Sequence, residues 1–206
     1  MKLAVLGGGG HCRSCIDVIR SAGLQIAGIV DPKPVSEIFG LPRLGSDDWL
    51  DSEEARGFSY LVTVGQIGVT PLRRNLFAAL QARNLESATV FASSAIVSAQ
   101  AGVGKGSIVM HRAVVNAGGA VGVNCIVNTG AIIEHDARIG DHCHISTGAI
   151  VNGDAEVGAG CMIGSGAVVL QGVKIAANVA VGAGAVVTRN VDAPGTWVGI
   201  PARRRA

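Results

Sequence analysis

Every sixth residue from Val97 to Val187 is a valine or an isoleucine, and this spacing dominates the second half of the chain. Four residues after each of the first twelve such positions comes alanine, serine, glycine or cysteine. Neither the 3.6-residue period of an α-helix nor the alternation of a strand produces this pattern. A six-residue repeat predicts a parallel β-helix, in which each coil buries its apolar face against its neighbours.

Glycines mark a longer repeat, which corresponds to three hexapeptides. Gly104, Gly122, Gly140 and Gly158 recur at every eighteenth position, each directly after an aliphatic residue. The repeat predicts a triangular coil with three short strands per turn. Residues 18 apart are therefore expected to lie one strand spacing, about 4.8 Å, from each other along the axis.

Three cysteines share the 18-residue interval, namely Cys125, Cys143 and Cys161. They occupy the small inward position of the repeat, so we expect one stacked column of buried thiols that act as small apolar side chains. The odd number of cysteines, five in all, favours a reducing cytoplasm. The apolar stretch at residues 3–6 is too short for a signal sequence or a membrane span. We expect a soluble cytoplasmic protein that does not bind membranes.

Before about residue 90 the hexapeptide spacing is absent, and strands alternate with helices. Strands are expected at about 2–6, 25–30 and 59–64, with helices at about 10–22 and 70–83. This alternation predicts a small parallel sheet with a ligand crevice at the strand ends. The expected fold class is thus a small α/β domain over residues 1–90, followed by a parallel β-helix with a C-terminal tail over residues 91–206.

A run of four glycines, Gly7 to Gly10, joins the first expected strand to the first helix. Its backbone N–H groups and the helix N-terminus can bind an anionic group. Asp31 ends the second strand and can accept hydrogen bonds from a sugar hydroxyl or a base N–H. Cys12 stands where the last glycine of a dinucleotide fingerprint belongs, so a nucleotide or phosphate site is favoured over an NAD site. A tight glycine turn without a ligand is the alternative.

Charge and composition exclude one class of partner. The formal net charge is +2 with 16% charged residues, which provides no basic field for nucleic acid. The 30 glycines and 3% aromatic residues suit a narrow prism with many corners.

His135 is the one histidine of the repeat with an acidic residue on each side, Glu134 and Asp136. Imidazole can accept a proton from an attacking amine or hydroxyl, and a neighbouring carboxylate can fix its tautomer. Gly153 follows His135 at the interval of the longer repeat, so its N–H is expected one coil along, where it can stabilise an oxyanion. A solvated corner histidine is the alternative. His144, half a coil from His135, either reaches a site shared with an adjacent subunit or lies on the surface.

These features resemble the hexapeptide acyltransferases, and among them the bacterial sugar acetyltransferases of the sialic acid O-acetyltransferase type. They particularly resemble the bacillosamine-pathway enzymes that N-acetylate a UDP-4-amino-sugar. The resemblance covers nearly the whole chain. It is carried by Gly-Gly-Gly-Gly-His at 7–11, Asp31, Val64-Gly65-Gln66, Asn128-Thr129, Glu134-His135-Asp136, His144, Gly153 and Gly199-Ile200-Pro201-Ala202-Arg203.

The resemblance implies a left-handed β-helix, a homotrimer with active sites between subunits, acetyl-CoA as co-substrate and no metal. It implies His135 as the general base, Asp136 as its partner and Gly153 as the donor to the thioester oxygen. The N-terminal domain would bind a nucleotide sugar. The residues implied to bind the acceptor are Gly8, Gly10, His11, Asp31, Gly65, Gln66, Asn128, Glu134 and His144.

Two departures from the family pattern lie at the implied nucleotide site. Gln66 stands where this group commonly has asparagine, and Pro32 rather than an acidic residue follows Asp31. At the other end of the chain, Arg203 and Arg204 either attract the phosphates of the coenzyme or form an exposed basic tail.

The leading hypothesis is direct transfer of an acetyl group from acetyl-CoA to the amine of a nucleotide-activated amino sugar. An O-acetyltransferase acting on sialic acid or a related sugar is the first alternative. A zinc-dependent carbonic anhydrase of the hexapeptide type is the second; it needs three converging ligands, whereas His111 and His135 are four hexapeptides apart rather than three and are expected on different prism faces. A purely structural β-helix is the third.

Overall fold

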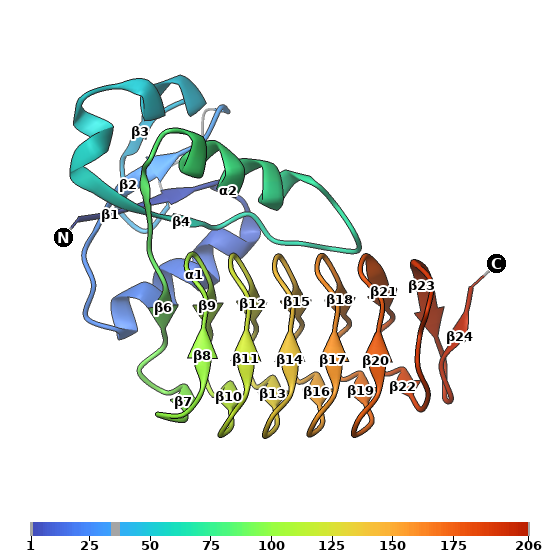
Figure 1. The fold of residues 1–206 in the computed structure, drawn as a ribbon. Helices are drawn as coiled ribbons and strands as arrows, with labels where there is room; N and C mark the ends of the chain where they lie inside the picture. Colours follow the sequence, from blue (N-terminus) through green and yellow to red (C-terminus); the bar gives the residue numbers. More distant parts are fainter. Residues whose placement is uncertain (1, 34–37, 206) are drawn as a thin grey trace.

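The computed structural model describes residues 2–33 and 38–205. An α/β layer lies on one face of a three-sided parallel β-helix (Figure 1). The α/β layer is built on a five-stranded sheet with the order β3-β2-β1-β4-β5. Its elements are β1 (Lys2–Leu6), α1 (Gly10–Ser21), β2 (Ile26–Val30), β3 (Arg43–Gly45), the 3-10 helices η1 (Asp47–Asp51) and η2 (Glu54–Gly57), β4 (Phe58–Val62), α2 (Leu72–Ala82) and β5 (Glu86–Ser87).

All strand pairings in this first sheet are parallel, which confirms the expectation from strand–helix alternation. The central strand β1 is buried from Leu3 to Leu6, as a strand covered on both faces must be. Gly9 precedes α1 with an extended backbone and provides no side-chain cap. The first backbone N–H groups of α1, which lie at the carboxyl end of β1, therefore have no side-chain cap.

The prism consists of three sheets of very short strands, which are parallel except for the last pair at the C-terminal end. We name two of the sheets by the residues on their outer faces and the third by the α/β layer that covers it. The aliphatic sheet comprises β7 (Ile96–Val97), β10 (Val114–Val115), β13 (Ile132–Ile133), β16 (Ile150–Val151), β19 (Val168–Val169) and β22 (Val186–Val187). The charged sheet comprises β8 (Gly102–Val103), β11 (Ala120–Val121), β14 (Arg138–Ile139), β17 (Glu156–Val157) and β20 (Lys174–Ile175). The docked sheet comprises β6 (Val90–Phe91), β9 (Ile108–Val109), β12 (Ile126–Val127), β15 (His144–Ile145), β18 (Met162–Ile163), β21 (Val179–Val181), β23 (Gly195–Val198) and β24 (Arg203–Arg204).

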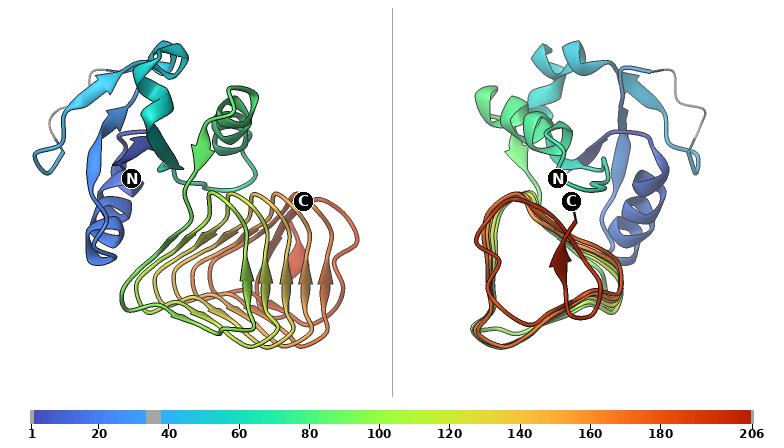
Figure 2. Two further views of the ribbon diagram at one scale, coloured as in Figure 1. Left: turned by 60° about the vertical axis from the view of Figure 1, so that its left-hand side comes forward. Right: turned by 90° about the vertical axis from the view of Figure 1, so that its right-hand side faces the viewer.

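Residues 18 apart pair in every sheet, as the sequence predicts. Val115 pairs with Ile133, and Ile133 pairs with Val151. Viewed along the axis, the coils superpose as a triangle with the α/β layer over one side (Figure 2). In the two-residue strands from β7 to β22, the second residue points into the prism, and these aliphatic residues form one continuous core with the small residues of the repeat.

The corners of the prism require, at every sixth position, a residue that adopts a left-handed backbone conformation. From Arg112 to Gly184, the residue at this position has a positive φ, and most of these residues are glycine, asparagine or aspartate. Asp136 is one of them, with φ 60°. The glycines at 104, 122, 140 and 158 have a different role, because a Cβ on each would lie within 3 Å of the backbone of the next coil.

The cysteine column lies in the core, and its thiols complete the hydrogen bonding of one corner. The Sγ of Cys143 donates to the Gly158 carbonyl at 3.2 Å and the Sγ of Cys125 to Gly140 at the same distance. The Cys143 N–H in turn reaches the Sγ of Cys125 at 3.4 Å. Each thiol thereby links successive coils, in addition to filling space.

The docked sheet is covered by the α/β layer. Ile16 and Ile19 of α1 belong to one buried cluster with Ile108 and Ile126, whose side chains face outward from the prism. Only two residues separate β5 from β6, and the division of the chain at residue 90 stays a prediction. Within the described residues, no helix has the length and apolar character required to cross a bilayer.

Candidate active site

A histidine–aspartate pair lies at the corner between the aliphatic and charged sheets. His135 and Asp136 follow β13, and Nδ1 of His135 donates to Oδ2 of Asp136 at 3.0 Å. This bond places the proton of the neutral imidazole on Nδ1 and leaves Nε2 as the acceptor. The two side chains are 56% and 60% exposed, so a substrate can reach them.

Two glycines, one in each neighbouring coil, make room for this pair. A Cβ at Gly153 would lie 2.7 Å from both Cε1 and Nε2 of His135, so the imidazole rests against the Gly153 backbone. On the other side, a Cβ at Gly118 would collide with Oδ1 of Asp136. The stacking of His135 on the coil that contains Gly153 is what the 18-residue spacing predicts. The Gly118 contact follows from the same spacing, since 118 precedes 136 by 18, but sequence reasoning missed it.

The charges around His135 favour its protonated form. The hydrogen bond to Asp136 raises the pKa of His135 above its ordinary value, and the nearby Asp154 and Glu134 carboxylates add to this effect. Glu134 itself accepts a hydrogen bond from Asn116 Nδ2 at 2.8 Å, one coil before. The His135 ring is therefore oriented by Asp136, while Glu134 is held by Asn116.

A second concave site lies in the α/β layer, at the carboxyl ends of β1, β2 and β4. This cavity, which we call the acceptor cavity after the expectation from sequence, has a volume of about 380 Å³. It is lined by Leu6, Gly7, Gly9, Gly10, His11, Val30, Asp31, Pro32, Lys33, Asp47, Thr63, Val64, Gly65, Leu72 and Leu76. Its position matches the ligand crevice that open α/β sheets form at their strand ends.

Asp31 shapes the floor of the acceptor cavity. Its Oδ2 accepts the Gly8 N–H at 2.7 Å, and its Oδ1 accepts the Lys33 N–H at 2.8 Å. The Gly8 N–H is thus already hydrogen-bonded to Asp31. The cavity wall at this point is formed by Gly9, which precedes α1, and Gly10, the first residue of α1. Lys33 adds a basic side chain at the same edge.

His144 lies under the α/β layer and joins it to the prism. Its side chain is buried, and Nδ1 donates to the Gln66 carbonyl at 2.7 Å. Nε2 then accepts the Asn128 Nδ2 amide at 3.0 Å, while Asn128 Oδ1 accepts the Thr129 N–H. A surface position for His144, one of the two expectations from sequence, is wrong, because the α/β layer covers it. Gln66 is also buried and does not line the acceptor cavity.

His11 connects the acceptor cavity with His144. It lines the cavity, its ring centroid is 6.5 Å from that of His144, and Gly65 packs closely against its Cβ. Burial lowers the pKa of His11 to about 4, with further lowering by Arg73 and His144. Burial likewise lowers the pKa of His144. Both rings are therefore neutral at physiological pH.

The structure brings the expected site residues together in two groups. His135, Asp136, Glu134 and Gly153 lie at one corner, whereas His11, Asp31, Gly65, Asn128 and His144 lie in or next to the α/β layer on the docked sheet. Arg203 and Arg204 belong to neither group. They form β24, which pairs antiparallel with β23 at the C-terminal end of the prism (Figure 1).

His111 lies apart from His135, at a corner that faces α1. Its Nδ1 is 2.8 Å from Ser94 Oγ, and its Nε2 is 3.5 Å from Asp17. Within residues 2–33 and 38–205, no group of three or more histidine, cysteine, aspartate or glutamate side chains is arranged to hold a metal ion.

Comparisons with known proteins match both halves of the chain. Residues 2–80 match the family model of the PglD N-terminal domain, and residues 154–189 match the bacterial transferase hexapeptide model. The acetyltransferase domain of PglB from Neisseria gonorrhoeae is 32% identical, with 99% of each chain covered and a TM-score of 0.92. The chain belongs to the PglD-type family of hexapeptide-repeat sugar N-acetyltransferases.

Further solved structures show what members of this family bind. The PglB domain has also been solved with acetyl coenzyme A. PerB from Caulobacter crescentus, in complex with CoA and GDP-perosamine, is 33% identical over 100% of this chain and 98% of its own, with a TM-score of 0.93. A search of curated proteins found no match. Membership of an N-acetyltransferase family excludes the carbonic anhydrase, scaffold and O-acetyltransferase alternatives.

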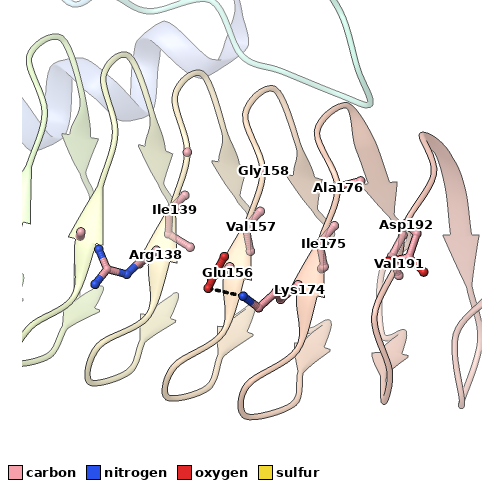
Figure 3. Close-up of a pocket in the computed structure, with 12 residues that line it drawn as sticks. Arg138, Ile139, Glu156, Val157, Gly158, Lys174, Ile175, Ala176, Val191 and Asp192 are labelled. Carbon is pink, nitrogen blue, oxygen red and sulfur yellow. Dashed lines mark ion pairs between the residues drawn. The ribbon is translucent and has the colours of Figure 1, made fainter.

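The outer faces of this acetyltransferase's two uncovered sheets differ in chemistry. On the charged sheet, a groove of about 490 Å³ carries Arg138, Glu156 and Lys174 at successive coils, and Glu156 pairs with Lys174 at 2.9 Å (Figure 3). Opposite charges on neighbouring strands stabilise a sheet and keep its face hydrated. On the aliphatic sheet the corresponding outward residues are all β-branched and apolar: Ile96, Val114, Ile132, Ile150, Val168 and Val186.

Proposed function

We propose that this protein transfers the acetyl group of acetyl-CoA to the amine of a nucleotide-activated amino sugar, with a UDP-4-amino-sugar as the first candidate acceptor. One observation carries the proposal: an imidazole oriented by a carboxylate through Nδ1, with its free Nε2 against the backbone of a glycine one coil away. A general base next to a free backbone donor is the arrangement that acyl transfer requires.

In the proposed mechanism, His135 Nε2 accepts a proton from the attacking amine as the new C–N bond forms at the thioester carbonyl. The Gly153 N–H stabilises the negative charge on the carbonyl oxygen, and collapse of this intermediate releases coenzyme A as the thiolate. Asp136 holds the ring in the required tautomer and stabilises the imidazolium. The prism cysteines are buried in the core and take no part as nucleophiles.

The acceptor cavity supports a nucleotide-activated substrate rather than a free sugar. Gly9 and Gly10 lie next to amides that no side chain caps, and these amides with Lys33 suit the diphosphate. Asp31 provides carboxylate oxygens for a ribose hydroxyl or a base N–H. Asn128, Gln66 and His144 hold the adjoining wall through the hydrogen bonds described above.

We also propose that the active form is a homotrimer with each site completed by two chains. The aliphatic stripe on β7 to β22 is the face expected to be buried, since contiguous exposed apolar surface marks interfaces. Within one chain, the acceptor cavity adjoins the docked sheet, whereas His135 lies at the corner between the other two sheets. An acceptor held by one chain therefore meets the base of its neighbour. Arg203 and Arg204 are the candidate partners for the coenzyme phosphates.

Thiol release from acetyl-CoA in the presence of UDP-, GDP- and CMP-linked amino sugars tests the proposed reaction. His135→Ala is expected to lower turnover by roughly a hundredfold or more, the usual contribution of a positioned general base. Unchanged turnover in this variant would falsify the assignment of the base.

Mixing two impaired variants, assayed at a nucleotide-sugar concentration far below KM, tests the shared site. His135→Ala removes the base and Asp31→Ala weakens the cavity, so trimers that contain both chains regain some sites with an intact cavity and an intact base. Activity that returns only after the chains are exchanged supports the shared site. Mixed trimers without recovered activity show that each chain acts alone.

A further inference from the structure

Arg73 is a charged residue on the buried face of α2. It shares that face with Phe77 and Leu80, and only 1% of its surface is exposed. Its Nη1 donates to the carbonyls of Val62 and Val64, and its Nε donates to the Asn124 carbonyl at 3.2 Å. The guanidinium thus contacts the end of β4 and a corner of the prism at the same time.

No carboxylate in the described part of the chain forms an ion pair with this cation. Among the described residues, the ion pairs do not include Arg73, and its Nη2 is buried without a hydrogen-bond partner. Burial lowers the pKa of Arg73 to about 10, so the side chain is still charged at neutral pH. A buried charge is costly to a folded protein unless hydrogen bonds compensate it, and three backbone carbonyls provide such bonds to Arg73.

The carbonyls that Arg73 binds belong to segments that shape the acceptor cavity. Thr63, Val64 and Gly65 line the cavity, and the Gln66 carbonyl accepts the proton of His144 Nδ1. On the prism side, Asn124 returns a hydrogen bond from Nδ2 to the Arg73 carbonyl at 3.3 Å. This contact fixes the position of residues 62–66 relative to the coils.

We propose that Arg73 is a positioning residue for the acceptor cavity: its guanidinium holds residues 62–66 on the prism, and with them the Gln66 carbonyl that binds His144. This structural role is independent of the proposed function. Only its kinetic consequence rests on the nucleotide sugar being the acceptor.

The hydrogen bonds of His144 require its neutral form. Nδ1 donates to the Gln66 carbonyl, and Nε2 accepts from the Asn128 amide. A protonated ring would present an Nε2–H to that amide donor. Apart from burial, the charged and titratable groups that lower the pKa of His11 are Arg73 and His144, and for His144 the group is Arg73. The cation on α2 therefore opposes protonation at both rings.

The sign of the resulting pH dependence follows from the lowered pKa values. In the unfolded chain a histidine protonates near 6.5, whereas His11 in the folded protein protonates near 4. Between these values the unfolded state binds more protons, so stability is complete above about pH 6.5 and falls as the pH decreases towards 4.

Histidine titration of the intact protein by NMR tests, without any substitution at Arg73, whether the His144 ring is held between Gln66 and Asn128. His11→Gln and His144→Gln, each used only to assign one resonance, identify the two signals. Both rings of the otherwise unchanged protein are expected to stay neutral at pH 6. Titration of His144 near 6.5 shows that the Gln66 carbonyl does not hold its ring, and it overturns the placement of residues 62–66 on the prism.

Two substitutions at Arg73 separate its charge from its geometry. Arg73→Met removes the charge but keeps much of the volume, and it should move both histidine midpoints up towards 6.5. Arg73→Lys keeps the charge but loses the planar guanidinium group that donates to several carbonyls at once. The histidine midpoints should therefore stay low, whereas KM for the nucleotide sugar should rise about tenfold, the scale of a lost hydrogen bond to a charged group. Arg74→Met, at the exposed neighbouring position of α2, is the matched control and should change neither readout.

Each outcome decides one point. An unchanged KM in Arg73→Lys overturns the positioning role, and unchanged histidine midpoints in Arg73→Met overturn the effect of the charge on the two rings. If Arg73→Met does not fold, KM of the lysine variant still decides the positioning role. If no nucleotide sugar is accepted, binding of UDP and GDP replaces KM, and the NMR titration needs no substrate.

Discussion

Replacement of Gly153 by alanine would place a methyl group against the imidazole of His135. The added Cβ would lie 2.7 Å from both Cε1 and Nε2, whereas non-bonded carbon atoms rest about 3.5–4.0 Å apart. The ring must therefore move by about 1 Å. A displacement of this size costs roughly a hundredfold in rate, which corresponds to about 2.7 kcal/mol of activation free energy.

The backbone itself accepts this substitution. Gly153 does not have the left-handed φ that disfavours a side chain, and His135 and Gln171 occupy the same corner position one coil away on either side. The free energy of unfolding should therefore change by less than about 0.5 kcal/mol. Gly102→Ala is the matched control, because a Cβ at this glycine of β8 would have no neighbour within 4 Å.

Initial rates of thiol release from acetyl-CoA, with melting temperatures measured in parallel, provide the test. Gly153→Ala should lose about two orders of magnitude in kcat/KM with an unchanged melting temperature, and Gly102→Ala should match the unsubstituted protein. If Gly153→Ala keeps its kcat/KM within about threefold, the proposed contact between ring and glycine has no role in the reaction.

Three further substitutions test other parts of the structure. Asp136→Asn removes the negative charge of the acceptor that raises the pKa of His135. Since a general base must be neutral to accept a proton, the acid limb of the kcat/KM profile should move to lower pH, and a limb that stays in place would contradict this. Cys143→Ala removes a hydrogen bond and a buried sulfur atom, so chemical denaturation should show a loss of about 1–3 kcal/mol, with a smaller loss for Cys143→Ser. Asp31→Ala frees the Gly8 amide and should raise KM for the nucleotide sugar about tenfold while KM for acetyl-CoA stays constant; equal changes in both would argue against a role in acceptor binding.

The prism and its corner pair could be predicted from sequence because the repeat leaves the chain little freedom. With an aliphatic residue inward at every sixth position, a slip of one residue would expose the core, so the spacing alone stacks the coil of His135 on that of Gly153. The contact between Gly118 and Asp136 follows from the same 18-residue spacing, applied from Asp136 towards the N-terminus.

The contacts between the two halves of the chain could not be predicted in this way. His144 occupies an outward position of the repeat, and nothing in the repeat indicates that the Gln66 carbonyl covers it. Arg73 lies on the apolar face of α2 in register with Phe77 and Leu80, where an amphipathic pattern favours a hydrophobic residue. These positions depend on how one layer is placed on the other, and no periodicity encodes that placement.

Because the coils stack, the number of residues between His135 and Gly153 determines whether the His135 ring lies against the Gly153 backbone. These residues are neighbours because one full turn of the prism separates them, so inserting or deleting a single residue within that turn would rotate the Gly153 N–H away from the His135 ring. A duplicated whole turn further along would leave both groups in place and only lengthen the prism. Natural variation in such enzymes should therefore change the number of turns freely, but preserve the residue count of this one.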